Sequence, residues 1–210
     1  MTVAALYAAT GGCYFGLPDV EPWDVTRDAR KYAGPHPVVA HPPCERWGRY
    51  WSGGPSAKVK RKRGDDDGCF AAALASVRAW GGVLEHPEAS SAWRHFGLIT
   101  PPREGGWVCA GDSGWTCCVE QGHYGHRARK ATWLYANGVD LPVLRWGRSA
   151  ARVRLDAGYH STEERRAAVA AGTHKPERRL TTEENMATPL EFRDLLISIA
   201  RSVRMKRRSA

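Results

Sequence analysis

Three short groups of residues carry side chains that could do chemistry. The first is His41-Pro42-Pro43-Cys44, in which two prolines stiffen the backbone immediately before a cysteine. A thiolate presented from a rigid loop is a strong nucleophile, and a nearby cation such as Arg46 would favour its ionised form. These residues predict that Cys44 is a nucleophile. The alternative is an ordinary buried cysteine.

The second group is Glu85-His86-Pro87, which follows a short apolar segment. A glutamate at the end of a buried strand can hold a proton and donate it to a ring nitrogen, because burial raises the pKa of a carboxyl group. We therefore expect Glu85 to act on a substrate. The alternative is a solvated or helix-capping carboxylate.

The third group is the basic segment from Gln121 to Lys130. Arg127 and Arg129 stand two positions apart, so in an extended segment they lie on the same face. Such a pair can bind a carboxylate, a phosphate or a base edge. The alternative is a solvated basic turn.

The elements that must position these groups follow from the pattern of apolar residues. Short apolar runs bounded by Gly and Pro predict strands, and apolar residues at helical spacing predict helices. The predicted strands are residues 3–9, 37–40, 83–85, 115–120 and 132–136, and the predicted helices are residues 27–32, 69–80, 89–96, 163–171 and 189–205.

This alternation predicts an α/β fold that is Rossmann-like, with a largely parallel sheet and flanking helices. We expect a compact α/β catalytic domain over residues 1–145, followed by a basic, Arg-rich helical extension over residues 146–210. Because ligands sit beyond the carboxyl ends of parallel strands, Cys44 and Glu85 should face one crevice.

The charge distribution indicates the class of partner. The chain of 210 residues has a net charge of +9. Residues 145–210 hold 15 Lys and Arg against 8 Asp and Glu, whereas residues 1–144 hold 16 against 14. This excess predicts a polyanionic partner, most simply nucleic acid, with a solubilising tail as the alternative.

Composition argues against other classes. Hydrophobic residues make up 42% of the chain, yet no run approaches the about 18 apolar residues of a membrane span. The apolar start lacks the basic residues of a signal peptide, and six cysteines are few for a disulfide scaffold. A cytoplasmic protein without a membrane partner is expected.

The order of these motifs resembles that of the cytosine-5 DNA methyltransferases, and their small phage-encoded relatives above all. The resemblance rests on Pro42-Pro43-Cys44, on Glu85 and on Tyr124-Gly125 followed by Arg127 and Arg129, and it covers roughly residues 3–137. It implies that Cys44 attacks ring carbon 6 of a pyrimidine while Glu85 contacts N3 and the exocyclic group. Arg129, or else Arg127, would orient Glu85 or a phosphate.

The segment from Ala9 to Gly16 is similar to the family's glycine-rich cofactor loop. The resemblance implies that Gly11, Gly12, Gly16 and Pro42 hold S-adenosylmethionine. The chain departs from the family at five points. Only 31 positions separate Cys13 from Cys44, His86 stands where the family has asparagine, and the glutamine of the family's Gln-x-Arg-x-Arg strand is not in register. The C-terminal Gly-Asn-Ser motif has no counterpart, and there is no room for a large target-recognition domain.

The implied substrate is DNA, in the bacterial host cytoplasm if the chain is phage-encoded. The target base must leave the duplex before a thiol can attack it. Aromatic and basic side chains near the nucleophile could stack on the strand and contact phosphate. These candidates are Trp47, Arg49, Trp51, Lys60, Arg61, Lys62, Arg63 and Lys130.

The leading hypothesis is therefore a DNA pyrimidine-modifying enzyme with a covalent Cys nucleophile, transferring a methyl or other one-carbon group. One alternative is a non-catalytic nucleic-acid-binding protein on the same fold. Another is a zinc-stabilised binding module, in which His41 and Cys44 join Cys117, Cys118, His123 and His126 as ligand candidates.

Overall fold

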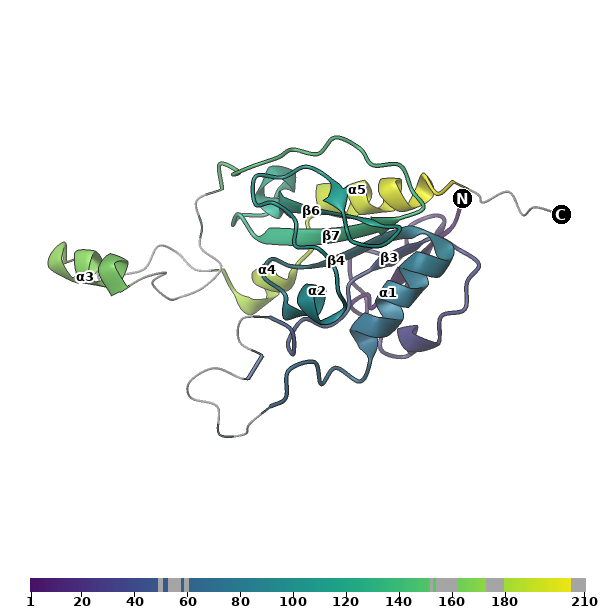
Figure 1. Cartoon of the computed structure of the whole chain (residues 1–210), viewed down its shortest axis with the longest axis horizontal. Coiled ribbons are helices and arrows are strands. Elements are labelled where there is room, and N and C mark those ends of the chain that lie inside the picture. The colour runs from purple at the N-terminus through teal and green to yellow at the C-terminus, as the bar shows by residue number, and fades with distance from the viewer. Residues whose placement is uncertain are drawn as a thin grey trace.

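A seven-stranded sheet forms the centre of the computed structural model, with the strand order β2-β1-β3-β4-β7-β6-β5 (Figure 1). The structure describes residues 1–48, 51–52, 58, 61–151, 153, 162–172 and 180–204. The strands are β1 (Val3–Leu6), β2 (Val20–Trp23), β3 (Val38–Ala40), β4 (Gly82–Pro87), β5 (Val108–Cys109), β6 (Trp115–Glu120) and β7 (Ala131–Asn137).

The described helices are mostly short. They are α1 (Cys69–Trp80), α2 (Ser91–His95), α3 (Thr162–Ala170), α4 (Thr182–Met186) and α5 (Leu190–Arg201), with the 3-10 turns η1 (Ala29–Lys31) and η2 (Gln121–Tyr124). No helix among these described segments is long and apolar enough to cross a membrane.

Strand direction divides the sheet into two parts. Strands β2, β1, β3 and β4 run parallel to one another. Strands β7, β6 and β5 continue the sheet with antiparallel pairing, and β6 and β7 form the expected hairpin. The α/β class is confirmed, and the parallel pairing is confined to the part that carries Cys44 and Glu85.

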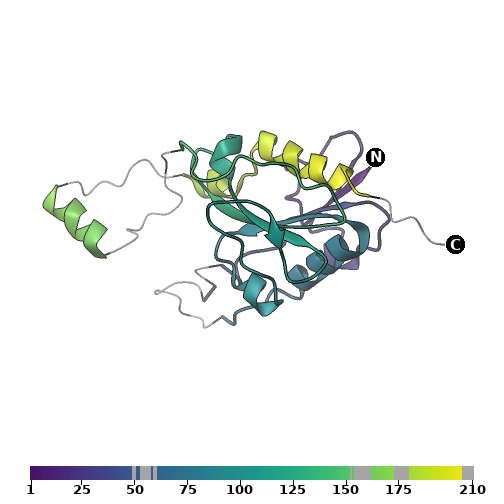
Figure 2. The same ribbon diagram turned by 45° about the horizontal axis from the view of Figure 1, so that its top comes forward.

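Helices cover both faces of the sheet, as Figures 1 and 2 show, with α1 on one side and α5 on the other. The α1 face packs Phe70, Leu74 and Val77 against the sheet. The α5 face packs Phe192 and Leu196 among others. The result is a three-layer arrangement with an apolar core on each side of the sheet.

The packing of α5 corrects the predicted division of the chain. Phe192 and Leu196 are fully buried, and Ile199 is 2% exposed. The boundary expected at residue 145 placed these residues in an extension, whereas they fill the core beneath the parallel strands. The net charge of the C-terminal third does not reveal that one face of this helix is apolar and buried.

Most of the elements near the site match their predictions. Helix α1 has the predicted bounds, and its start is fixed by Asp66, whose Oδ2 accepts a hydrogen bond from the Phe70 amide at 2.9 Å. Strand β2 was not predicted, because Pro22 lies in its middle. Pro22 is tolerated there because β2 is an edge strand of the sheet.

Gly82 brings β4 close to β3. Its φ is +129°, and a Cβ added there would lie 1.9 Å from the Val38 carbonyl oxygen. A side chain at this position would force the two strands apart. The glycine therefore sets the close pairing of the two strands that carry the candidate nucleophile and carboxylate.

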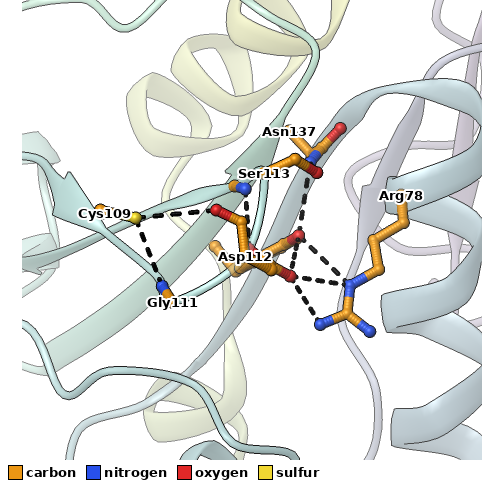
Figure 3. Close-up of polar contacts among 8 residues, drawn as sticks. Arg78, Cys109, Gly111, Asp112, Ser113 and Asn137 are labelled. Atoms are coloured by element: carbon orange, nitrogen blue, oxygen red, sulfur yellow. Dashed lines mark hydrogen bonds and ion pairs between the residues drawn. The ribbon is translucent and has the colours of Figure 1, made fainter.

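A polar cluster ties α1 to the antiparallel strands at the other end of the sheet (Figure 3). Asp112, in the β5–β6 turn, accepts hydrogen bonds at its Oδ2 from Arg78 Nη2 at 2.6 Å and from the Tyr135 hydroxyl at 2.9 Å. Its Oδ1 accepts one from the Gly114 amide at 2.7 Å. These bonds anchor the C-terminal end of α1, which carries Arg78.

Candidate active site

The candidate nucleophile and carboxylate come from neighbouring parallel strands. The register pairs Ala40 of β3 with Leu84 of β4, so His41, the first residue after β3, lies beside Glu85 of β4. Cys44 follows within the His41-Pro42-Pro43-Cys44 loop. The two groups therefore meet at the carboxyl edge of the sheet, as predicted for open α/β folds.

Glu85 is held at both carboxylate oxygens. Its Oε2 lies 2.9 Å from Nδ1 of His41, and its Oε1 accepts a hydrogen bond from Nε2 of Gln121 at 3.2 Å. The same Gln121 nitrogen donates to the Thr132 hydroxyl at 2.9 Å. The side chain of Glu85 is 14% exposed, so it sits in a protein-lined position with a small opening to solvent.

The ionisation of Glu85 differs from the prediction. Burial alone would raise its pKa, but the hydrogen bond and charge of His41, with further contributions from Lys130 and His86, hold the pKa below its ordinary value. The group is therefore a carboxylate at neutral pH. It accepts hydrogen bonds instead of storing a proton as the sequence suggested.

Cys44 is half-buried, and its thiol is held protonated in the free protein. Burial raises its pKa, and the negative charges of Glu85 and Glu45 raise it further. Lys130 is the cation that acts in the opposite direction. Arg46, the cation expected to ionise this thiol, is not among the groups that shift the Cys44 pKa, and Lys130 takes that place.

Lys130 is the cation of this site. Its pKa is lowered by burial, while Glu85 and Cys44 act to raise it, which places its ammonium group near both. Its Nζ also donates to the Ala187 carbonyl at 2.9 Å. The backbone of Lys130 has a φ of +41°, an uncommon conformation for a residue with a side chain.

Arg127 and Arg129 do not orient Glu85, contrary to the expectation from the resemblance. Both side chains are exposed, and Arg127 forms an ion pair with Glu184 of α4. The partners of Glu85 are His41 and Gln121 instead. A contact of either arginine with phosphate remains a prediction.

The glycine loop reaches the site through Tyr14. The loop turns tightly, since the Gly12 amide donates to the Ala9 carbonyl at 2.8 Å. The Tyr14 hydroxyl then lies 2.7 Å from Nε2 of His41. Pro42, the residue after His41, is buried. The contact between Tyr14 and His41 therefore places the glycine loop and the Pro-Pro-Cys segment at the same edge of the sheet.

The candidates for nucleic-acid contact separate into two groups. Trp47 was expected to stack on a base, but it is 2% exposed in the α1-side core and donates from Nε1 to Asp66 at 2.7 Å. Trp51 is half-buried beneath Arg63, whose Cζ lies 4.8 Å from its ring centre. Arg61, Lys62 and Arg63 are exposed, whereas Arg49 and Lys60 lie outside the described residues.

The His and Cys residues considered as zinc ligands do not come together in the described structure. In the described ranges, no group of three or more His, Cys, Asp or Glu side chains is placed to hold a metal ion. Both ring nitrogens of His41 contact protein groups, and Cys117 and Cys118 lie in the cores on opposite faces of the sheet.

Sequence reasoning assigned no role to Tyr14, Gln121 or Asp24. Gln121 immediately follows β6, which pairs with β7. Its position at the end of a predicted strand was the one sequence feature that could have indicated a role for it. Asp24 immediately follows β2 and is 8% exposed. Its carboxylate accepts hydrogen bonds from Thr10 of the glycine loop at 2.8 Å and from Thr26 at 2.6 Å.

Comparison of the chain with protein-family models, curated proteins and solved structures finds no match. The function must therefore be argued from the site. A thiol, a fixed carboxylate and an ammonium group in one place can add a nucleophile to an electron-poor ring and stabilise the charge that moves.

Proposed function

We propose that the chain is a DNA-modifying enzyme that attacks a pyrimidine base through Cys44 and transfers a one-carbon group to it. The observation that supports this most is the electrostatic coupling of three groups at one edge of the sheet. The pKa of Cys44 responds to Glu85 and Lys130, and the pKa of Lys130 responds to Glu85 and Cys44. The resemblance to cytosine-5 methyltransferases supplies the reaction class.

In the proposed reaction, the Cys44 sulfur forms a bond to ring carbon 6, and the electron pair of the 5,6 double bond becomes available at carbon 5. The Glu85 carboxylate accepts a hydrogen bond from the exocyclic N–H of cytosine, and it passes the proton of the Cys44 thiol to N3 as the sulfur adds. After carbon 5 has gained the one-carbon group, its proton passes to water and the sulfur–carbon bond breaks. The proton on N3 returns to the sulfur through Glu85, which restores the ring and the thiol.

Lys130 is assigned to charge stabilisation in this scheme. The Cys44 thiol is protonated in the free protein, so its deprotonation must accompany substrate binding. A positive charge facing the thiolate lowers the cost of that step. The exposed basic residues Arg61, Lys62 and Arg63 are assigned to the phosphates of a strand whose target base has left the stack.

The residues after β1 and β2 fit a nucleoside-type donor. A Cβ added at Gly11 or Gly16 would meet no atom within 4 Å, so the loop has open space beside its backbone. Asp24, at the end of the neighbouring strand, keeps acceptor capacity for a hydroxyl group. S-adenosylmethionine, when bound there, would supply the methyl group.

The test is nucleoside mass spectrometry of DNA from cells that express the chain. We expect a modified pyrimidine in DNA from cells with the wild-type chain and none with Cys44→Ala or Glu85→Gln. Cys109→Ser is the matched control, because Cys109 is exposed and lies far along the sheet, next to the Asp112 turn. Unmodified DNA with intact DNA binding would support the non-catalytic alternative instead.

A further inference from the structure

A continuous hydrogen-bonded chain of side chains crosses the site. It runs from the Tyr14 hydroxyl to Nε2 of His41 at 2.7 Å, and from Nδ1 of His41 to Oε2 of Glu85 at 2.9 Å. It continues from Oε1 of Glu85 to Gln121 at 3.2 Å and from Gln121 to Thr132 at 2.9 Å. The members come from separate segments of the sheet edge, so the chain fixes those segments relative to one another.

The hydrogen-bonding capacity of these groups defines the direction of the bonds. An ionised carboxylate only accepts, so Nδ1 of His41 must carry the proton that faces Glu85. In neutral His41, Nε2 is then an acceptor, and the Tyr14 hydroxyl donates to it. In protonated His41, Nε2 donates to the same hydroxyl oxygen. Tyr14 therefore satisfies His41 in either state, and the Nδ1 bond to Glu85 persists.

We propose that His41 is the positioning residue of this site and fixes the Glu85 carboxylate in the orientation that faces the substrate. This inference rests on the proposed function. His41 holds one oxygen and Gln121 holds the other, so the plane of the carboxylate cannot rotate without breaking a bond. Each oxygen keeps lone-pair capacity for the N–H groups of a substrate.

His41 is better suited to this task than the other titratable groups that face Glu85. Lys130 donates to the Ala187 carbonyl and approaches Glu85 as a charge, with no hydrogen bond to it in the described structure. His86 is fully buried on the same strand, and no hydrogen bond joins its ring to Glu85 among the described residues. The directional bond that orients Oε2 comes from His41.

The test uses His41→Ala, His41→Asn and Tyr14→Phe in the full chain. Asparagine keeps an N–H donor for Glu85 but cannot take a proton, so it separates orientation from charge. His95→Asn is the matched control, because His95 is exposed. Circular dichroism confirms that each variant is folded, and His41→Asn preserves the test if His41→Ala does not fold.

The first measurement does not depend on activity. Carboxyl carbon NMR follows the titration of Glu85, whose signal is assigned by its loss in Glu85→Gln. We expect the titration midpoint of Glu85 to move upward in His41→Ala and to a smaller extent in His41→Asn. An unchanged midpoint in His41→Ala would overturn the proposal whether or not the chain modifies DNA.

The second measurement is the rate of DNA modification as a function of pH. We expect His41→Ala to lower kcat about tenfold or more, with KM for DNA unchanged, because a charge-assisted hydrogen bond is lost at a reacting group. His41→Asn should recover part of the rate. Wild-type kcat and an unaltered pH profile in His41→Ala would overturn the proposal, whereas an inactive wild-type chain would refute the proposed function.

Discussion

The Nδ1 atom of His41 lies 2.9 Å from Oε2 of Glu85, although 44 positions separate the two residues in the chain. The contact joins the residue that follows β3 to a residue within the neighbouring parallel strand β4, and it keeps Glu85 ionised in a largely buried position. The carboxylate therefore meets a substrate as a fixed acceptor. The negative charge of Glu85 also raises the pKa of the neighbouring Cys44 thiol.

The reactivity of Cys44 should respond in opposite directions to its two charged neighbours. Lys130→Met should slow alkylation of Cys44 by iodoacetamide at pH 8, because loss of the cation raises the thiol pKa further. Glu85→Gln should speed it, because loss of the negative charge lowers that pKa. The measurement is the alkylation rate at Cys44 by peptide mass spectrometry.

Lys31→Met is the control for charge, because Lys31 is exposed and pairs with Asp28 away from this edge. It should leave the alkylation rate at the wild-type value. Equal rates in Lys130→Met and the wild-type chain would show that Lys130 does not act on the thiol.

Glu184 should compete with DNA for Arg127. Glu184 pairs with Arg127 and also completes a capping box with Thr181. Glutamine can replace glutamate in a capping box. Glu184→Gln should therefore free Arg127 without removing the cap. We expect tighter DNA binding, and a slope of log K against log salt that is steeper by about 0.9 for one added phosphate contact.

Glu183→Gln removes the same charge from α4, but no ion pair joins Glu183 to Arg127 in the described structure. It should change the salt slope less than Glu184→Gln does. Identical effects of the two substitutions would mean that net charge alone is measured and that Arg127 does not contact phosphate.

Helix α5 should be essential for stability. Leu196→Ala removes a fully buried side chain from the core, and such a change costs about 2–5 kcal/mol of unfolding free energy. Ser198→Ala, on the exposed side of the same helix, should change it by less than about 0.5 kcal/mol. Urea unfolding measures both, and a tolerant Leu196 would contradict the packing of α5 on the sheet.

Stability should fall as the pH drops from neutrality toward 4. Burial lowers the pKa of His86 from 6.5 to about 4, so the unfolded chain binds a proton there more readily than the folded chain. The stability contribution is complete above pH 6.5 and is lost as the pH falls toward about 4. His126, whose pKa is also lowered by burial, adds to the same loss.

His86→Leu removes the titrating ring, so the free energy of unfolding should change less between pH 7 and pH 5 than in the wild-type chain. His95→Leu, at an exposed histidine, is the control for replacing a histidine by leucine. The prediction fails if His86→Leu loses as much stability over this range as the wild-type chain.

Much of the fold near the site could be predicted from local patterns. The alternation of apolar runs identified β3, β4, α1 and the β6–β7 hairpin, because these elements carry their own turn and cap signals. Strand β2 was missed because Pro22 is acceptable only at an edge position, and edge position is a property of the whole sheet. Helix α5 was predicted as a helix, but its burial depends on the face that the sheet leaves uncovered.

The candidate site was predicted in its position and only partly in its contacts. The predicted order of strands indicated that Glu85 lies beside the His41 segment, although β4 continues to Pro87 and Glu85 is not at its end. The partners of Glu85 could not be found this way, since Tyr14, His41 and Gln121 meet only through tertiary packing. The alternation expected at residues 127–129 is present, since Ala128 is buried between two exposed arginines, but the basic side chain that acts on Glu85 is that of Lys130.

The covalent role of Cys44 is tested most directly by trapping with DNA that carries cytosine fluorinated at carbon 5. Loss of the carbon-5 proton releases the thiolate in the proposed reaction, and fluorine blocks that step. With S-adenosylmethionine present, we expect a protein–DNA adduct that survives denaturation, maps to Cys44 by peptide mass spectrometry, persists in Cys109→Ser and disappears in Cys44→Ser. Modification of ordinary DNA by Cys44→Ser at the wild-type rate would contradict the covalent mechanism.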